Sequence, residues 1–179
     1  EAMDFVHIDA RVTSFQDALQ LNINKIYKSR EGEYYPEDYF PKTNKEINEM
    51  LQKVRSYVTH IKDINLRSLL EEFFVKDKEF IDKFKNHSAA KSVHHSFMGG
   101  LLEHTLSVTN MCDYYAKSYP IINRDLLLSA ALLHDIGKMD ELSSFPRNDY
   151  TDEGQLLGHI FIGANKVSDK IKGMTNFPD

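Results

Sequence analysis

The chain has 179 residues, which is enough for one ordinary domain with a small appendage. Apolar residues make up 41% of the sequence and charged residues 27%, a balance that suits a globular core and argues against disorder or a membrane span. The net charge of −5 argues against a protein that coats nucleic acid through a broad basic surface, so any phosphate would be held locally by a metal or a few basic groups.

Two runs near the start of the chain alternate between apolar and polar residues and predict a β-hairpin. They surround the short polar stretch "TSFQDA", and their apolar residues are Val6, Ile8, Ala10 and Val12 in the first run and Leu19, Leu21 and Ile23 in the second. An isolated hairpin is only marginally stable in water, so we expect this one to belong to a larger sheet. Residues 29–43, with two prolines and many polar side chains, are predicted to be a linker.

From residue 44 onward the apolar spacing becomes helical, which predicts a mainly α-helical body. The expected helical stretches are residues 44–61, 65–84, 101–119, 124–138 and 155–171, separated by loops that include 85–100 and 141–154. Asn123 is a suitable N-cap for the fourth stretch, and Gly137 is a suitable terminator for it. Thr151 or Asp152 is expected to cap the last stretch.

The sequence also bears on where the protein works. No apolar run is long enough to cross a bilayer and no signal-peptide pattern opens the chain, so we expect no membrane partner. Cys112 is the only cysteine, which excludes an internal disulfide and favours the cytoplasm. Because the chain opens with Glu1 rather than Met, we expect it to be a fragment of a longer protein.

Three of the eight histidines, His104, His134 and His159, lie on apolar faces of three different predicted helices. The residues that mark these faces are Val108, Met111 and Tyr115 for the first histidine, and Leu156 and Gly163 for the third. Each histidine should point toward the core if its helix packs normally. With Asp135 beside the second, the set suits divalent Mn, Fe or Zn in a helical bundle. From spacing alone, a metal site and ordinary core histidines bonded to carbonyls stay equal alternatives.

Three short strings, "LLEHTLSV", "LLHDIGK" and "GHI" in this order, carry a resemblance to a known family. They resemble the HD superfamily of metal-dependent phosphohydrolases, which is named for an adjacent His-Asp pair. The longer ordered set, from "HHSFMGGLLEHT" to "YTDEGQLLGHIFIGA", resembles the YhaM-type 3′→5′ exoribonucleases. This resemblance implies an OB-fold in front of an HD domain. Residues 1–28 would be the closing strands of the OB-like domain, residues 29–43 the linker and residues 44–179 the HD domain.

The resemblance implies four metal ligands, namely His104, His134, Asp135 and His159. The site would hold one or two divalent ions, with Mn as the expected metal. If two ions bind, Asp135 is the natural bridge, since a carboxylate has two oxygens and an imidazole nitrogen cannot span two ions. Further ligands are implied beyond His159, but Asp169 points elsewhere on its helix and Asp179 is the last residue. We therefore expect the HD domain to lack its C-terminal part here and to bind metal weakly or not at all.

Other residues are candidates for contact with a substrate phosphate. Lys138, one turn beyond the His-Asp pair, is placed to stabilise charge on a phosphate, so Lys138 and Asp135 are the catalytic candidates. The alternative for Lys138 is a cation favoured at a helix C-terminus. His94 and His95 precede the Gly-Gly turn at 99–100, which is expected to allow a close approach of this loop to the next helix. One of the two histidines is implied to reach a phosphate, and exposed loop histidines are the alternative.

Together these features predict a metal-dependent 3′→5′ exonuclease that hydrolyses single-stranded RNA, with single-stranded DNA as a second substrate. The HD core alone does not choose a substrate, so a nucleotide phosphohydrolase or a cyclic-nucleotide phosphodiesterase is one alternative. A non-catalytic nucleic-acid-binding module is another. The lysines between residues 76 and 91 would be either a path for an RNA backbone or a solvated helix face. The sequence is compatible with both a monomer and a homo-oligomer.

Overall fold

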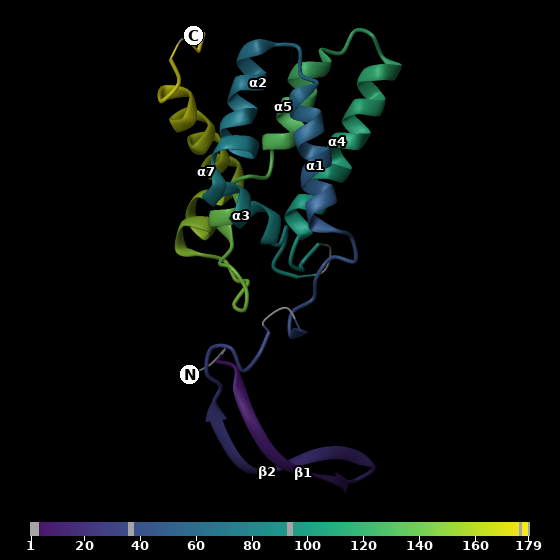
Figure 1. The fold of residues 1–179 in the computed structure, drawn as a ribbon, viewed down its shortest axis with the longest axis vertical. Helices are drawn as coiled ribbons and strands as arrows, with labels where there is room; N and C mark the ends of the chain where they lie inside the picture. The colour runs from purple at the N-terminus through teal and green to yellow at the C-terminus, as the bar shows by residue number, and fades with distance from the viewer. Residues whose placement is uncertain (1–3, 36–37, 93–94, 176, 179) are drawn as a thin grey trace. The chain divides into compact units, whose positions relative to one another are not determined.

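A computed structural model describes residues 4–35, 38–92, 95–175 and 177–178 of the chain. The chain forms two compact units, Glu1–Tyr39 and Phe40–Asp179. The first unit carries two strands and the second carries the helices, which make up 53% of the chain (Figure 1). The predicted fold class, mainly α-helical with a leading β-hairpin, is confirmed. The assignment of residues 1–28 to an OB-like domain, and the linker and HD-domain limits drawn with it, stay predictions.

The hairpin pairs β1 (Val6–Phe15) with β2 (Ala18–Lys28) in antiparallel register. Its two turn residues, Gln16 and Asp17, both have positive φ (49° and 62°), as expected for the tight turn whose twist matches that of the strands. Val12 lies opposite Leu21, so the predicted apolar residues share one face. That face is exposed, with Val12 at 62% and Leu21 at 57% exposure. The expectation that the hairpin belongs to a larger sheet stays a prediction.

The helical unit surrounds one hydrophobic core. Its helices are α1 (Ile47–Thr59), α2 (Ile64–Glu71), the π-helical turn η2 (Glu72–Lys76), α3 (Lys78–Asn86), α4 (Gly100–Ser118), α5 (Arg124–Leu133), α6 (Lys138–Glu141) and α7 (Asp152–Lys172). Figure 1 shows α1, α2, α4 and α5 side by side, and these helices contact one another. In α1 the buried residues recur at helical spacing: Met50, Leu51, Val54 and Val58. This stripe explains why the segment folds as an amphipathic helix against the core.

The helical stretch predicted at residues 65–84 is broken at Asp77, which corrects the expectation of one continuous run. The backbone of Asp77 is extended, with φ −81° and ψ 93°. Its carboxylate accepts a hydrogen bond of 2.9 Å from the Phe80 amide and caps α3. The break lets aromatic rings from both sides meet in the core, namely those of Phe73, Phe74, Phe80 and Phe84.

The Asp77 carboxylate also pairs with Lys170 of α7, Oδ2 lying 2.6 Å from Nζ. The hydrogen bond from Lys170, and then that from the Phe80 amide, hold the pKa of Asp77 below its ordinary value of 3.8. A carboxyl group with a lowered pKa stabilises the fold above the unfolded-state pKa, and this stabilisation is lost as the pH falls through the folded value.

Replacing Asp77 by Asn keeps a good helix cap and removes only the charge. We expect this change to lower the free energy of unfolding by about 1 kcal/mol or less near neutral pH, since both side chains are partly exposed. The difference should shrink as the pH falls below 3.8. Urea denaturation of both chains across this range measures it, and a difference that stays constant with pH would contradict the assignment.

The fourth predicted helix ends earlier than expected. Asn123 caps α5 as predicted, accepting from the Leu126 amide at 3.1 Å. However, α5 ends at Leu133, and the next four residues form turns before α6 begins at Lys138. Gly137 is therefore not the terminator of that helix. Lys138 opens a helix rather than closing one, so its interpretation as a cation at a helix C-terminus is wrong.

The last helix, α7, is capped by Thr151, whose hydroxyl accepts from the Gly154 amide at 2.9 Å. It is kinked at Gly158, which has φ 71° and ψ 157°, a conformation that side chains with a Cβ rarely adopt. The predicted common face of Leu156, His159 and Gly163 is therefore wrong, because the kink turns Leu156 outward to 83% exposure while Gly163 is buried. None of the helices in the described ranges combines the length and apolarity needed to cross a bilayer.

Candidate metal centre

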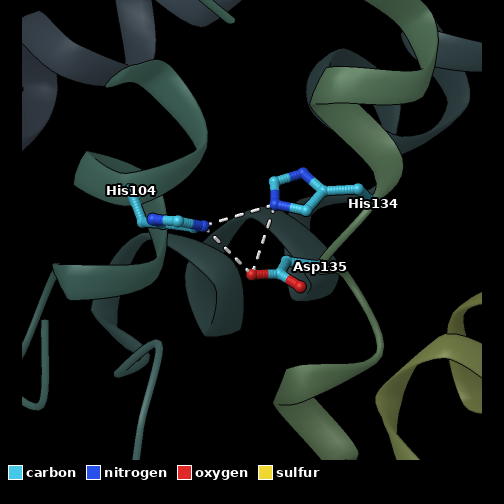
Figure 2. Close-up of side chains that lie close together, drawn as sticks. All are labelled: His104, His134 and Asp135. Atoms are coloured by element: carbon cyan, nitrogen blue, oxygen red, sulfur yellow. Dashed lines mark hydrogen bonds and ion pairs between the residues drawn. The ribbon is translucent and has the colours of Figure 1, made fainter. Parts of the chain in front are cut away.

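Three separate elements bring the predicted ligands together. His104 projects from the second turn of α4, and His134 and Asp135 lie in the turns between α5 and α6 (Figure 2). His159 follows the kink of α7. The site therefore depends on contacts between segments that are far apart in the sequence.

The first three residues place one atom each at the corners of a nearly equilateral triangle. His104 Nε2 and His134 Nε2 each lie 3.3 Å from Asp135 Oδ2, and 3.3 Å from each other (Figure 2). The centre of such a triangle is roughly 1.9 Å from each corner, close to the ~2.0–2.2 Å bonds that imidazole nitrogen and carboxylate oxygen make to zinc. The spacing of these three atoms is therefore close to that needed to hold a divalent ion.

The tautomer of His134 suits a metal ligand. Its Nδ1 lies 2.7 Å from the carbonyl oxygen of Ala131. Because a carbonyl can only accept, Nδ1 carries a proton. In the metal-free protein Nε2 also carries a proton when it donates to Asp135, and loss of that proton would leave the Nε2 lone pair facing the triangle. Metal-binding histidines are commonly oriented in this way by a partner on the second ring nitrogen.

His159 lies on the other side of the same carboxylate. Its Nε2 is 3.5 Å from Asp135 Oδ1, whereas His104 and His134 face Oδ2. Its Nδ1 is 2.9 Å from Oε1 of Glu141, a closer contact than that of Nε2 with Asp135, so the proton of a neutral ring is favoured on Nδ1. The two oxygens of Asp135 thus face two different sets of imidazoles.

The charge of Asp135 is maintained by its neighbours. Its side chain is only 8% exposed, and burial alone would raise its pKa, but hydrogen bonds from His104 and His134 outweigh burial and bring the pKa well below the ordinary value. The hydrogen bond with Asp135 is in turn the main cause of a raised pKa at His134. Asp135 is therefore an ionised carboxylate under ordinary conditions, ready to accept a cation.

Small residues allow the close contact between the His-Asp turn and α7. A Cβ added at Gly137 would lie 2.0 Å from the carbonyl oxygen of His159 and 2.7 Å from the amide nitrogen of Gly163. Both atoms belong to the backbone and have no room to move aside. Glycine at position 137 is thus required for His159 to reach Asp135.

A second pair of glycines positions the loop beside His104. Gly99 has φ 81°, and a Cβ added at Gly100 would lie 2.1 Å from the carbonyl oxygen of His95. The predicted close approach of this loop to the start of α4 is confirmed. The ring centroids of His95 and His104 are 5.4 Å apart, which brings His95 to the edge of the site. His94 lies outside the described residues.

The site is open rather than buried in the core, which corrects an expectation from the sequence. The side chains of His104, His134 and His159 are 32%, 34% and 29% exposed. On α4 the stripe that continues from His104 faces outward, with Met111 61% exposed and Tyr115 47% exposed. The buried face of α4 is instead one residue further round the helix, at Leu101, Leu102, Thr105, Leu106 and Thr109. The imidazoles therefore border the core without entering it.

The remaining candidates from the sequence are already paired with other residues or lie outside the described residues. Asp169, 73% exposed, pairs with Lys172, and Asp179 lies outside the described residues. Lys138 is partly buried beside Glu141, Nζ lying 3.7 Å from Oε2.

Several lysines of the basic stretch are in ion pairs, namely Lys76 with Glu72, Lys83 with Asp140, Lys85 with Asp82 and Lys91 with Asp149. These pairs favour the solvated-face interpretation over a path for RNA.

Sequence reasoning missed Glu141. This residue was placed at the start of a loop, but it ends α6 and is buried, with 8% of its surface exposed. Its Oε1 accepts hydrogen bonds from both the backbone amide and Nδ1 of His159, at 3.0 and 2.9 Å. The two residues are 18 positions apart, so no local pattern in the sequence could indicate the contact.

The comparison with protein families assigns this part of the chain. Residues 101–174, which include all four predicted ligands, match the HD domain family. The helical unit contains an HD domain. Such a domain implies a divalent metal ion, and the His104, His134 and Asp135 atoms of this HD domain form a group that fits one.

Known relatives extend the similarity beyond the HD domain. The chain is 33% identical over 168 residues to the 3′-5′ exoribonuclease YhaM of Bacillus velezensis, covering 93% of this chain and 52% of that protein. It is 34% identical over 166 residues to the protein of the same name from Listeria monocytogenes (91% and 51%), and 37% identical over 151 residues to that from Bacillus licheniformis (83% and 47%). The chain spans about half the length of the curated relatives it matches. No solved structure matches it significantly.

Proposed function

We propose that the protein is a metal-dependent 3′→5′ exoribonuclease that acts on single-stranded RNA. The observation that carries the proposal is the convergence of His104, His134 and Asp135 on one point within an HD domain. The relatives named above as exoribonucleases supply the direction of attack and the substrate. No observation on the described residues favours a mononucleotide hydrolase or a non-catalytic binding module.

In this proposal His104, His134 and Asp135 Oδ2 hold one divalent ion, with Mn²⁺ as the expected metal. His159 would help to hold a second ion, and Asp135 would be the ligand shared by both if two ions bind. A bound divalent ion supplies an activated water and neutralises charge on the scissile phosphodiester. The openness of the site supports a polymeric substrate, because a chain end can approach imidazoles that are about one third exposed.

The protein's own side chains hold charges and protons in place around this position. Asp135 stays ionised because His104 and His134 hold its pKa low. Ala131 holds a proton on Nδ1 of His134, so Nε2 would be the nitrogen that gives up its proton and binds the metal. Lys138 would meet a phosphate oxygen of the substrate, and His95, beside His104, would reach the next phosphate. Residues 1–28 would belong to an OB-like domain that binds the single strand.

The test is a digestion by this chain and by a longer parent protein that contains it. Single-stranded RNA with a free 3′ end and the same RNA with a blocked 3′ end are incubated with Mn²⁺, with chelator controls. We expect the free-ended RNA to be shortened from its 3′ end and the blocked RNA to resist. A DNA oligonucleotide of the same sequence measures the preference between RNA and DNA.

Two results would contradict the proposal. Equal digestion of blocked and free-ended RNA would indicate an endonuclease. RNA binding without hydrolysis by the Mn²⁺-loaded parent protein would indicate a binding module.

A further inference from the structure

Glu141 contacts His159 at two atoms at once. At Gly158 the backbone leaves the helical conformation, so His159 begins a second helical segment of α7. Oε1 of Glu141 lies 3.0 Å from the His159 amide nitrogen and 2.9 Å from its Nδ1. One carboxylate oxygen therefore caps the new segment through its first amide and also holds the imidazole ring.

The short helix α6, which carries Glu141, is held in place by contacts with α3 and α7. The backbone carbonyl of Glu141 accepts from the Thr151 amide at 3.0 Å, which ties the end of α6 to the start of α7. The neighbouring Asp140 pairs with Lys83 of α3 at 2.6 Å and with Lys166 of α7 at 2.5 Å. α6 is therefore attached on both sides, and its last residue is buried in a fixed position.

The contact has a chemical consequence for the ring. A neutral imidazole carries one proton, on either nitrogen, and a partner on one nitrogen decides which. Both ring nitrogens of His159 face a carboxylate oxygen, but only Glu141 Oε1, at 2.9 Å from Nδ1, is within hydrogen-bond distance, so Glu141 keeps the proton of a neutral ring on Nδ1. Nε2 is then free of a proton and faces Asp135 Oδ1 at 3.5 Å. Without Glu141, the ring could rotate, and its proton could lie on either nitrogen.

We propose that Glu141 is a positioning residue that sets the tautomer and orientation of His159 while capping the second segment of α7. The role of His159 as a metal ligand rests on the proposed function. The control of its tautomer does not, because it depends only on contacts within the metal-free chain.

The direct test is the imidazole ¹⁵N spectrum of the metal-free chain, recorded at about pH 8, above the ordinary histidine pKa of about 6.5. A His159→Gln variant identifies the His159 signals among those of the eight histidines. We expect the proton on Nδ1 in the wild type and in Glu141→Gln, whose amide oxygen still accepts. In Glu141→Leu, which has no acceptor, the Nε2-protonated form should appear.

Asp169→Asn is the matched control, since it removes an exposed carboxylate of α7 that pairs with Lys172 and not with His159 or α6. It should leave the tautomer unchanged. Should Glu141→Leu fail to fold, Glu141→Asp serves instead, because its shorter side chain withdraws the acceptor by one methylene. Retention of the Nδ1 proton in the variant that lacks the acceptor would overturn the proposal.

Metal affinity provides the second readout. We expect Glu141→Leu to weaken Mn²⁺ binding about 10- to 100-fold, as is typical for loss of a partner behind a ligand. In a His159→Gln background the same change should have little further effect, because Glu141 would act through His159. An equally large loss in both backgrounds would overturn the proposal. If the wild-type parent protein binds no Mn²⁺, the proposed function fails, and the tautomer comparison still decides the role of Glu141.

Discussion

Replacing Asp135 by Asn should weaken Mn²⁺ binding by at least about 100-fold, more than the 10- to 100-fold expected for a residue behind the ligands. The reason is geometric and electrostatic. Oδ2 of Asp135 is one corner of the triangle with His104 and His134, and it carries the only negative charge among those three atoms. An amide of the same shape supplies no charge and places an NH₂ group against one of the imidazoles. Calorimetric titration with Mn²⁺ measures the loss, and exonuclease activity should fall with it.

Asp113→Asn is the matched control for this prediction. Asp113 is also a buried aspartate, 9% exposed at its side chain, but it pairs with Lys117 and Arg124 on the far part of α4. Its replacement should lower the free energy of unfolding and leave Mn²⁺ affinity within about twofold, since ligand and control are too far apart to share partners. Near-wild-type affinity in Asp135→Asn would contradict the site.

Replacing Gly137 by Ala should lower the free energy of unfolding by about 3 kcal/mol and displace His159. The added methyl group would lie 2.0 Å from a backbone oxygen of α7 and 2.7 Å from a backbone nitrogen. Overpacking of this kind costs typically about 1–3 kcal/mol, and contact with backbone atoms puts this case at the upper end. Urea denaturation measures the stability, and the ¹⁵N signals of His159 report its displacement.

Gly173→Ala provides the comparison for the glycine prediction. Its added Cβ would meet only the carbonyl oxygens of Lys170 and Asp169, at 3.4 and 3.8 Å, and its φ of −79° suits any residue. This variant should unfold within about 0.5 kcal/mol of the wild type. A similar loss of stability in both variants would show that the close approach at Gly137 is not the cause.

The helices differ in how well the sequence predicted them. α1 was predicted well, because Met50, Leu51, Val54 and Val58 follow the helical period and one stripe faces the core. The ends of other helices were misplaced where a side chain or a contact decides them. Asp77 ends a helical run by capping the next helix, and Gly158 kinks α7 where the sequence shows only a glycine.

The candidate site, like the helices, was predicted only in part from the sequence. Residue types and spacing made His104, His134, Asp135 and His159 candidates but left a metal site and core histidines as equal alternatives. The resemblance to the HD superfamily implied all four as ligands, and the structure brings all four together. Their expected burial was wrong, because the stripe of apolar residues beside His104 does not face the core. Glu141 was missed because its importance arises from a contact across 18 residues.

The amino-acid sequence by itself determined the hairpin, the helical periodicity and the identity of the metal-ligand candidates. These follow from spacing over a few residues and from side-chain chemistry, both of which are local. Only the tertiary structure decided which oxygen of Asp135 faces which imidazole, which nitrogen of His134 and His159 carries the proton, and where Lys138 lies. Those outcomes depend on atoms from distant segments meeting within about 3–4 Å, the range of hydrogen bonds and close ion pairs, and packing of the whole unit sets such distances.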